Sequence, residues 1–283
     1  EVDAAIAGLE PVLRLSEATQ MDLAACSDLV TDSMSALGLS VEELSGYLDV
    51  CTAANNSANT SAEALMEAFI GCGGTAKTIG ADLNDMAVAL GILANNGTKG
   101  SEAGTALNAM LVRMTSKDAA IKAMKELGVS AFDSSGKFIG LNEVLADLQG
   151  ALSKLTDEEQ AAYMSSIAGT NYYTEMSYLL DAVGKSTAEM AENSEEAGGA
   201  WEELAEAADS SLSAWDSLSG KLENSDGALM KMAETVTDTL PGAFSRLNSA
   251  VDDAKISFAG AFSEDLKDMI NGLAENIPEM TEG

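Results

Sequence analysis

Apolar residues recur at helical spacing throughout residues 1–184. After Gly100 they fall at i, i+3, i+4, i+7, i+8 and i+11, which places them on one face of an α-helix. These residues are Ala103, Ala106, Leu107, Met110, Leu111 and Met114. An earlier stripe precedes Gly38, a residue type that often ends helices, and consists of Leu23, Cys26, Val30, Met34 and Leu37. Because short amphipathic helices are marginal alone, we expect residues 1–184 to form a compact helical domain.

Three sequence signals predict where helices of this domain begin. A Ser or Thr followed three residues later by Glu is typical of a capping box, in which each side chain binds a backbone amide of the other residue. The signals are Ser40-Val41-Glu42-Glu43, Thr60-Ser61-Ala62-Glu63 and Thr156-Asp157-Glu158-Glu159. The clustered acids of the third signal favour helix capping over the paired carboxylates of a glycosidase.

Glycines predict where several helices end. We expect Gly71, Gly73 and Gly74 to break the helix that begins at Ala64, because glycine weakens a helix interior. The apolar run Leu83–Leu93 then predicts another helix, which ends at Asn95-Asn96-Gly97. Its uncharged stretch is far shorter than the roughly 20 residues that a membrane-spanning helix needs, so we expect no membrane span.

One small β-hairpin is expected inside the helical domain. Its strands would be Val129–Phe132 and Lys137–Ile139, joined by the turn Asp133-Ser134-Ser135-Gly136. Glycine at the end of a four-residue turn supplies a positive φ angle. A calcium-binding loop is excluded because the regular acidic ligands and the bidentate glutamate are missing.

A heptad pattern begins after residue 185, in an acidic region. Apolar or small residues follow at intervals of seven: Trp201, Ala208, Trp215, Leu222, Leu229 and Val236. This spacing predicts a long helix that packs like a coiled coil and associates with a second copy through this seam. The stretch Asn224-Ser225-Asp226-Gly227 leaves a second arrangement open, in which two arms run antiparallel. We interpret the two tryptophans as seam residues rather than as a ligand platform.

The overall pattern favours an all-α fold: short packed helices with one small β-hairpin, followed by longer coiled-coil-like helices. Helix-forming residues dominate, and the 283-residue chain has only three prolines. We expect three regions: a compact helical domain at 1–184, an acidic heptad arm at 185–240 and an amphipathic helix at 241–283. The chain opens on Glu1 rather than Met, which suggests a piece of a longer protein.

The charge balance excludes several partners. Forty-six acidic residues oppose 15 basic ones, for a formal net charge of −31. Phosphate-binding surfaces need lysine and arginine to displace counterions, so direct binding to nucleic acid is not expected. Adhesion to an anionic membrane is disfavoured for the same reason. Solubility through mutual repulsion is one explanation of the acidity.

Most catalytic and metal-binding chemistry is also disfavoured, so we expect no enzyme, no cofactor and no metal. The chain has no histidine, which removes Ser–His–Asp and Cys–His catalysis and the histidine-based zinc sites. Cys26, Cys51 and Cys72 lack Cys-x-x-Cys spacing and are expected to be buried free thiols. The run from Gly97 to Thr105 superficially suggests a phosphate loop, but it lacks the Gly-Lys-Ser/Thr sequence, so we interpret it as a site of close helix packing.

Two motifs nevertheless resemble a known family. The first contains Gly97, Gly100, Ser101, Gly104 and Thr105, in the run Gly-x-x-Gly-Ser-x-Ala-Gly-Thr-Ala-Leu. The second is the later Asp-x-x-Gly turn of Asp133 and Gly136. The residues of these motifs and their order resemble the core region of phage tail tape measure proteins, and a further resemblance is found in residues 227–251. It implies that the first motif is structural.

The resemblance implies a structural virion protein. Tape measure proteins extend inside the lumen of the tail tube, template polymerisation of the tube, set tail length and leave before or with the DNA. The implied partners are tail tube subunits and tail assembly chaperones, met in the host cytoplasm during assembly. The acidity would then also keep the segment from sticking to passing DNA. Heptads and acidity alone fit an alternative equally well, a secreted or cell-surface helical protein-interaction module.

Overall fold

The computed structural model describes residues 2–186, 189–190, 201 and 212–238. Within these residues the chain forms twelve α-helices, one 3-10 turn and no strand, which confirms the all-α class. The elements are α1 (Val2–Thr19), α2 (Leu23–Leu37), η1 (Val41–Glu43), α3 (Leu44–Ser57), α4 (Ala62–Ile79), α5 (Leu83–Asn95), α6 (Gly100–Ser116), α7 (Asp118–Glu126), α8 (Leu141–Leu152), α9 (Asp157–Ala168), α10 (Tyr173–Gly184), α13 (Ala214–Glu223) and α14 (Ala228–Asp238). Residues 1–232 form one compact unit and residues 233–283 a second.

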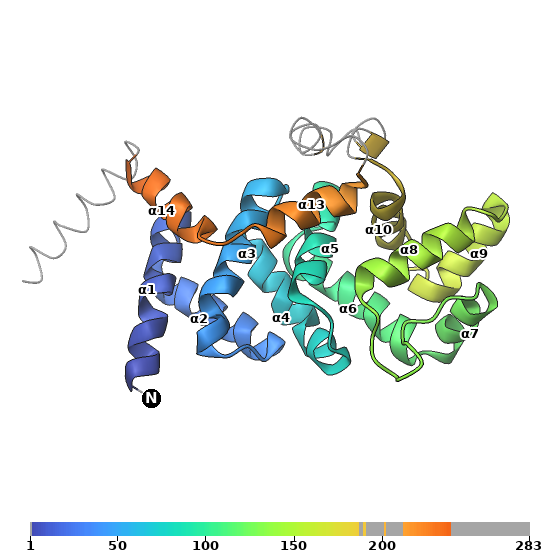
Figure 1. The fold of residues 1–283 in the computed structure, drawn as a ribbon, viewed down its shortest axis with the longest axis horizontal. Coiled ribbons are helices and arrows are strands. Elements are labelled where there is room, and N and C mark those ends of the chain that lie inside the picture. Colours follow the sequence, from blue (N-terminus) through green and yellow to red (C-terminus); the bar gives the residue numbers. More distant parts are fainter. Residues whose placement is uncertain (1, 187–188, 191–200, 202–211, 239–283) are drawn as a thin grey trace, which may run out of the picture. The chain divides into compact units, whose positions relative to one another are not determined.

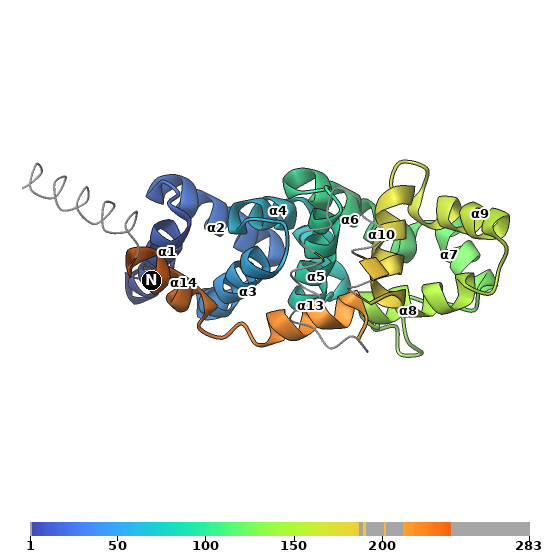
Figure 2. The ribbon, with the colours of Figure 1, turned by 90° about the horizontal axis from the view of Figure 1, so that it is seen from above.

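Helix α5 is the centre of the first unit. Every residue from Met86 to Asn95 is buried, and α5 contacts α3, α4, α6, α8, α10 and α13. Figures 1 and 2 show it between α3 and α4 on one side and α8 and α10 on the other. A helix that is apolar on all sides belongs in a protein core when it is too short for a membrane. None of the described helices is long and apolar enough to cross a membrane.

The predicted helix boundaries are largely confirmed. Helix α2 ends at Gly38, which adopts the left-handed conformation with φ 74°. The capping boxes at Ser40 and Thr156 are both present, although the first opens the 3-10 turn rather than an α-helix. The box expected at Thr60 is wrong, because the helix begins one residue later: Ser61 caps α4 by accepting a hydrogen bond from the amide of Ala64. Local side-chain chemistry therefore fixes these starts.

The expected break at Gly71, Gly73 and Gly74 is wrong. Helix α4 continues through all three glycines to Ile79. Its neighbours explain why: α2 and α6 both pack closely against α4, and two of the glycines lie where those backbones approach. The tertiary packing therefore outweighs the cost of about 1 kcal/mol that each glycine imposes on a helix.

The expected β-hairpin is also wrong. The segment between α7 and α8 contains a single antiparallel bridge, between Phe132 and Phe138, and no strand. Each arm pairs through too few residues, and no third segment extends the pairing. The two phenylalanine rings meet edge to face with centroids 6.1 Å apart. The segment is a tight turn closed by an aromatic pair.

The expected long heptad helix does not form in the described residues. Helix α13 ends at Glu223 and α14 begins at Ala228, so they contain ten and eleven residues and are shorter than α4. Gly227 interrupts them with a φ of 75°. The amphipathic helix expected at 241–283 lies outside the described residues, as does most of 187–211. The ranges 1–184, 185–240 and 241–283 therefore stay predictions.

Candidate functional site

The first motif forms the start of α6 at its crossing with α4. Gly97 is exposed in the loop after α5, with φ 94°, and Gly100 is the buried first residue of α6, with φ 57°. A β-carbon on Gly100 would lie 2.8 Å from a carboxylate oxygen of Glu67 on α4. Glycine at residue 100 therefore meets two demands, a left-handed backbone and a close neighbour.

Gly104 is the point of closest approach between the two helices. A β-carbon there would collide with the carbonyl oxygen of Ala68 and lie 2.8 Å from both the carbonyl carbon and the Cα of that residue. Gly71 faces the same crossing, where an added β-carbon would lie 3.3 Å from the carbonyl carbon of Gly104. Backbone atoms cannot rotate away as a side chain can. The close-packing interpretation of this motif is therefore confirmed.

The hydroxyl-bearing residues of the motif lie on the outer face of α6. Ser101 and Thr105 are exposed, and the Thr105 hydroxyl donates to the Ser101 carbonyl within the same helix at 2.8 Å. One polar link does cross the interface, because the Thr75 hydroxyl of α4 donates to the Asn108 side chain of α6. Nothing in this arrangement resembles a phosphate cradle.

On the opposite face of α4, a second glycine allows close packing against α2. Gly73 is buried, and a β-carbon there would lie 2.9 Å from the carbonyl carbon of Ala36 and 3.0 Å from the amide nitrogen of Leu37. Helix α4 is thus packed between α2 and α6 (Figure 2), with glycine at both contacts. We name this arrangement, comprising Ala36, Gly71, Gly73 and Gly104, the glycine crossing.

The second motif is a separate turn at the other end of α6. One carboxylate oxygen of Asp133 accepts hydrogen bonds from the Ser135 amide at 2.8 Å, the Ser135 hydroxyl at 2.6 Å and the Lys137 amide at 2.9 Å. The Ser135 hydroxyl bond, followed by the Lys137 amide bond, lowers the pKa of Asp133. Gly136 takes φ 82°. Phe132 shares a small pocket with Met114 near the C-terminus of α6, so the two motifs flank opposite ends of this helix.

Acidic side chains cap the starts of two helices distant in sequence, and sequence reasoning missed both. Asp85 of α5 accepts hydrogen bonds from the Leu141 amide at 3.0 Å and the Asn142 amide at 3.3 Å, at the start of α8. Burial raises the pKa of Asp85, and the Asn142 amide opposes that rise. Asp49 of α3 caps the start of α14 in the same way, through the amides of Gly227 and Leu229, both at 2.9 Å.

The guanidinium of Arg113 caps the C-terminal end of helix α9. Arg113 of α6 donates to the carbonyl oxygens of Ile167 at 2.9 Å and Ser166 at 2.8 Å, in the last turn of α9. A positive charge suits this end of the helix dipole. Arg113 and its partners are more than fifty residues apart along the chain, so no local pattern in the sequence points to the contact.

The described heptad residues as far as Leu229 are buried inside the first unit. Trp215, Leu218 and Leu222 are fully buried on α13, which contacts α3, α5 and α10 and lies beside α3 and α5 in Figures 1 and 2. A β-carbon on Gly91 of α5 would lie 3.0 Å from a methyl carbon of Leu218. Trp201 and Leu229 are buried, Val236 is half-buried, and Ala208 lies outside the described residues.

The predicted self-association through this seam therefore needs correction. Spacing by seven indicates that a helix has one apolar face. On α13, helices of the same chain cover that face. Pairing a second copy through Trp215 and Leu222 would first require α13 to leave the core. Where the structure describes it as far as Leu229, the heptad seam is therefore packed inside the chain's own core.

Reactive side chains do not gather into a site in the described part of the chain. The three cysteines are free and buried there, and burial raises the pKa of Cys26 to about 11 and those of Cys51 and Cys72 to about 12, so all three stay protonated thiols at neutral pH. Among the same residues, no group of three histidine, cysteine or acidic side chains could hold a metal ion.

Comparison with known proteins gives a consistent result. The sequence model of the family described as "Phage-related minor tail protein" matches residues 1–169. A tape measure protein of Pneumococcus phage Dp-1 is 31% identical over 246 residues, which cover 87% of this chain and 19% of that protein. A probable tape measure protein of Escherichia phage P2 is 28% identical over 185 residues, which cover 64% of this chain and 23% of that relative.

The chain thus spans about a fifth of the length of these curated relatives. No solved structure matches it significantly. The family match covers more than half of the chain and includes both motifs and the whole glycine crossing. The chain belongs to the phage-related minor tail protein family.

Proposed function

We propose that this chain is a packed helical section of a phage tail tape measure protein, a structural component of the virion. The observation that carries the proposal is the similarity to a tape measure protein along 87% of the chain. Both relatives named above belong to phages, which does not favour the alternative of a secreted or cell-surface interaction module. A structural role is also in keeping with the family and needs no catalytic group.

The proposal extends to the whole parent protein. It would occupy the lumen of the tail tube, set tail length, template the polymerisation of tube subunits and leave ahead of or with the DNA. During assembly in the host cytoplasm it would meet tail tube subunits and tail assembly chaperones. The net charge of −31 supports this placement, because an acidic segment does not adhere to DNA that passes it.

Within the parent, we assign this section to assembly rather than to measurement. A ruler needs axial length, which a continuous helix supplies at 1.5 Å per residue. The longest described helices, α1 and α4, have 18 residues and would span only about 27 Å each. The helices from α2 to α13 bury their apolar faces on one another. Length would then be measured by longer helices elsewhere in the parent protein.

An in-frame deletion in the parent phage tests this assignment. Removing residues 100–116 deletes α6, and with it Gly104 of the glycine crossing, and we expect no tails, because α4, α5, α7 and α9 all lose a packing partner. The control deletion removes the same number of residues from a long uninterrupted helix elsewhere in the parent. It should leave viable phage with tails shorter by about 25 Å, as measured by electron microscopy.

The contrast between the two deletions decides the assignment. Viable phage with proportionally shorter tails after loss of residues 100–116 would show that this section measures length. Normal tails after the same deletion would show that the section is dispensable for assembly.

A further inference from the structure

An apolar groove lies between α1, α2 and η1. It has a cavity volume of about 1070 Å³ and its floor includes Leu9, Val12, Leu23, Val30, Met34 and Val41. Nine large apolar side chains are exposed in the described residues, and four of them, Leu9, Leu13, Leu23 and Val41, belong to these three elements. Exposed apolar side chains gathered in this way mark an interaction surface rather than scattered surface residues.

The groove has the dimensions of a helix-binding site. Its α2 wall extends from Leu23 to Ser35, which corresponds to about 18 Å or three helical turns. Along this wall the apolar lining residues are Leu23, Ala24, Val30 and Met34, and the exposed hydroxyl-bearing residues Ser27, Thr31 and Ser35 lie among them. An amphipathic helix binds an apolar groove through apolar anchors at i, i+3 or i+4, and i+7.

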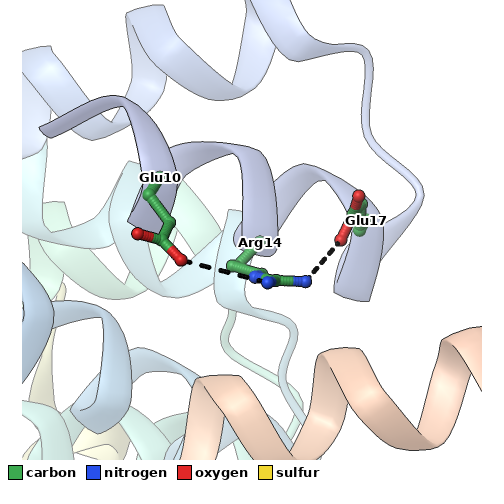
Figure 3. A network of polar contacts seen from close by, with 3 residues as sticks. All are labelled: Glu10, Arg14 and Glu17. Atoms are coloured by element: carbon green, nitrogen blue, oxygen red, sulfur yellow. Dashed lines mark hydrogen bonds and ion pairs between the residues drawn. The ribbon is translucent and has the colours of Figure 1, made fainter. Parts of the chain in front are cut away.

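The charge around the groove indicates which kind of partner could bind there. Residues 1–77 contain twelve acidic residues and two basic ones, Arg14 and Lys77, and the Lys77 side chain lies against Gly38 at the C-terminal end of α2. The Arg14 guanidinium already pairs with Glu17 at 3.5 Å and Glu10 at 3.9 Å on α1 (Figure 3). Asp22 is the only charged side chain in the lining of the groove. The surface around the groove is therefore strongly negative.

This charge disfavours three possible occupants. A second copy of the chain would bring another acidic surface, and an anionic membrane or nucleic acid would be repelled in the same way. The exposed carboxylates of Asp28, Asp32 and Glu42 lie on α2 and η1, the same elements that line the groove.

We propose that this groove binds a basic amphipathic helix of another protein, with an apolar face on the groove floor and lysine or arginine along its flanks. The apolar contacts would supply the binding energy, and the acidic surroundings would speed association and select against acidic partners. This inference rests on the geometry and charge of α1, α2 and η1, and it does not depend on the tape measure role.

Peptide binding to the full chain tests the proposal. The probe is a fluorescently labelled 14-residue peptide of leucine and lysine, with leucines at i, i+3, i+4 and i+7. One comparison peptide has the same composition in scrambled order, and another replaces each lysine with glutamate. Anisotropy titrations at physiological salt should show binding of the first peptide at least tenfold tighter than that of either comparison peptide.

Substitutions then locate the site. Leu23→Lys removes an apolar contact and adds a positive charge at an exposed position, so it should weaken binding of the first peptide about tenfold. Ile70→Lys is the matched control, because Ile70 is 42% exposed against 40% for Leu23, lies on α4 and is not part of the groove lining; binding should be unchanged. Circular dichroism checks that both variants are folded.

Three outcomes would overturn the proposal. Equal binding of the ordered and scrambled peptides would show attraction by charge alone. Equal effects of Leu23→Lys and Ile70→Lys would show that the groove is not the site. A dimer in sedimentation that Leu23→Lys dissociates would identify a second copy as the occupant.

Discussion

Leu222→Ala should lower the free energy of unfolding by about 2–5 kcal/mol, the usual cost of removing a buried leucine side chain. The Leu222 side chain is fully buried on α13, which packs against α3, α5 and α10. For a folded unit of this size, the loss corresponds to a fall of roughly 5–20 °C in melting temperature. Thermal unfolding followed by circular dichroism measures it.

The concentration dependence of this effect identifies what covers Leu222. Because helices of the same chain bury it, the melting temperature and solution mass of Leu222→Ala should not change with protein concentration. Leu212→Ala is the control, since Leu212 is 42% exposed in the same region, and its loss should be small. A melting temperature that rises with protein concentration in the wild type, but not in Leu222→Ala, would show that two copies associate through this seam.

Gly104→Ala should destabilise the chain by about 2–3 kcal/mol, towards the upper end of the cost of overpacking a core. The added methyl group would meet the backbone of Ala68, so α4 and α6 would have to move apart. This cost outweighs the gain of up to about 1 kcal/mol that alanine normally brings to a helix. Urea unfolding monitored by circular dichroism gives the difference.

Gly74→Ala makes the same chemical change three residues from Gly71 and serves as the matched control. Gly74 is exposed in α4, and a β-carbon there would have no neighbour within 4 Å. This variant should gain roughly 0.5–1 kcal/mol through helix propensity. The two substitutions should therefore shift stability in opposite directions. Equal shifts, or a stable Gly104→Ala protein, would mean that the crossing is looser than described.

The glycines show where sequence reasoning succeeds and where it fails. The apolar stripe from Ala103 to Met114 and the cap at Gly38 depend on local periodicity and backbone geometry, and both were predicted. Gly71 and Gly73 were expected to end a helix, because their local propensity opposes one. Their role depends on Ala36 and Gly104 in other helices, which no local pattern reveals.

The heptads and the helix caps show the same limit. Spacing by seven located an apolar face through Trp215 and Leu222, but it cannot tell whether the same chain or a second copy covers that face. The caps of Asp49 and Asp85 on distant helix starts also left no signal, because each carboxylate and its amides are far apart in sequence. The sequence therefore located the glycine motif. The helix that packs against this motif, and the caps on distant helices, can be identified only from the three-dimensional structure.

The central claim is that this section of the parent protein is a packed assembly domain that does not measure tail length. An insertion tests it most directly. Twenty-eight residues of helix-forming heptads are inserted between Ser134 and Ser135, in an exposed turn between α7 and α8. The insertion separates Asp133 from Ser135 and Lys137 but lies outside both flanking helices. Tail length in the resulting phage is measured by electron microscopy. We expect viable phage with tails of unchanged length, whereas tails longer by about 42 Å, the rise of 28 helical residues, would contradict the claim.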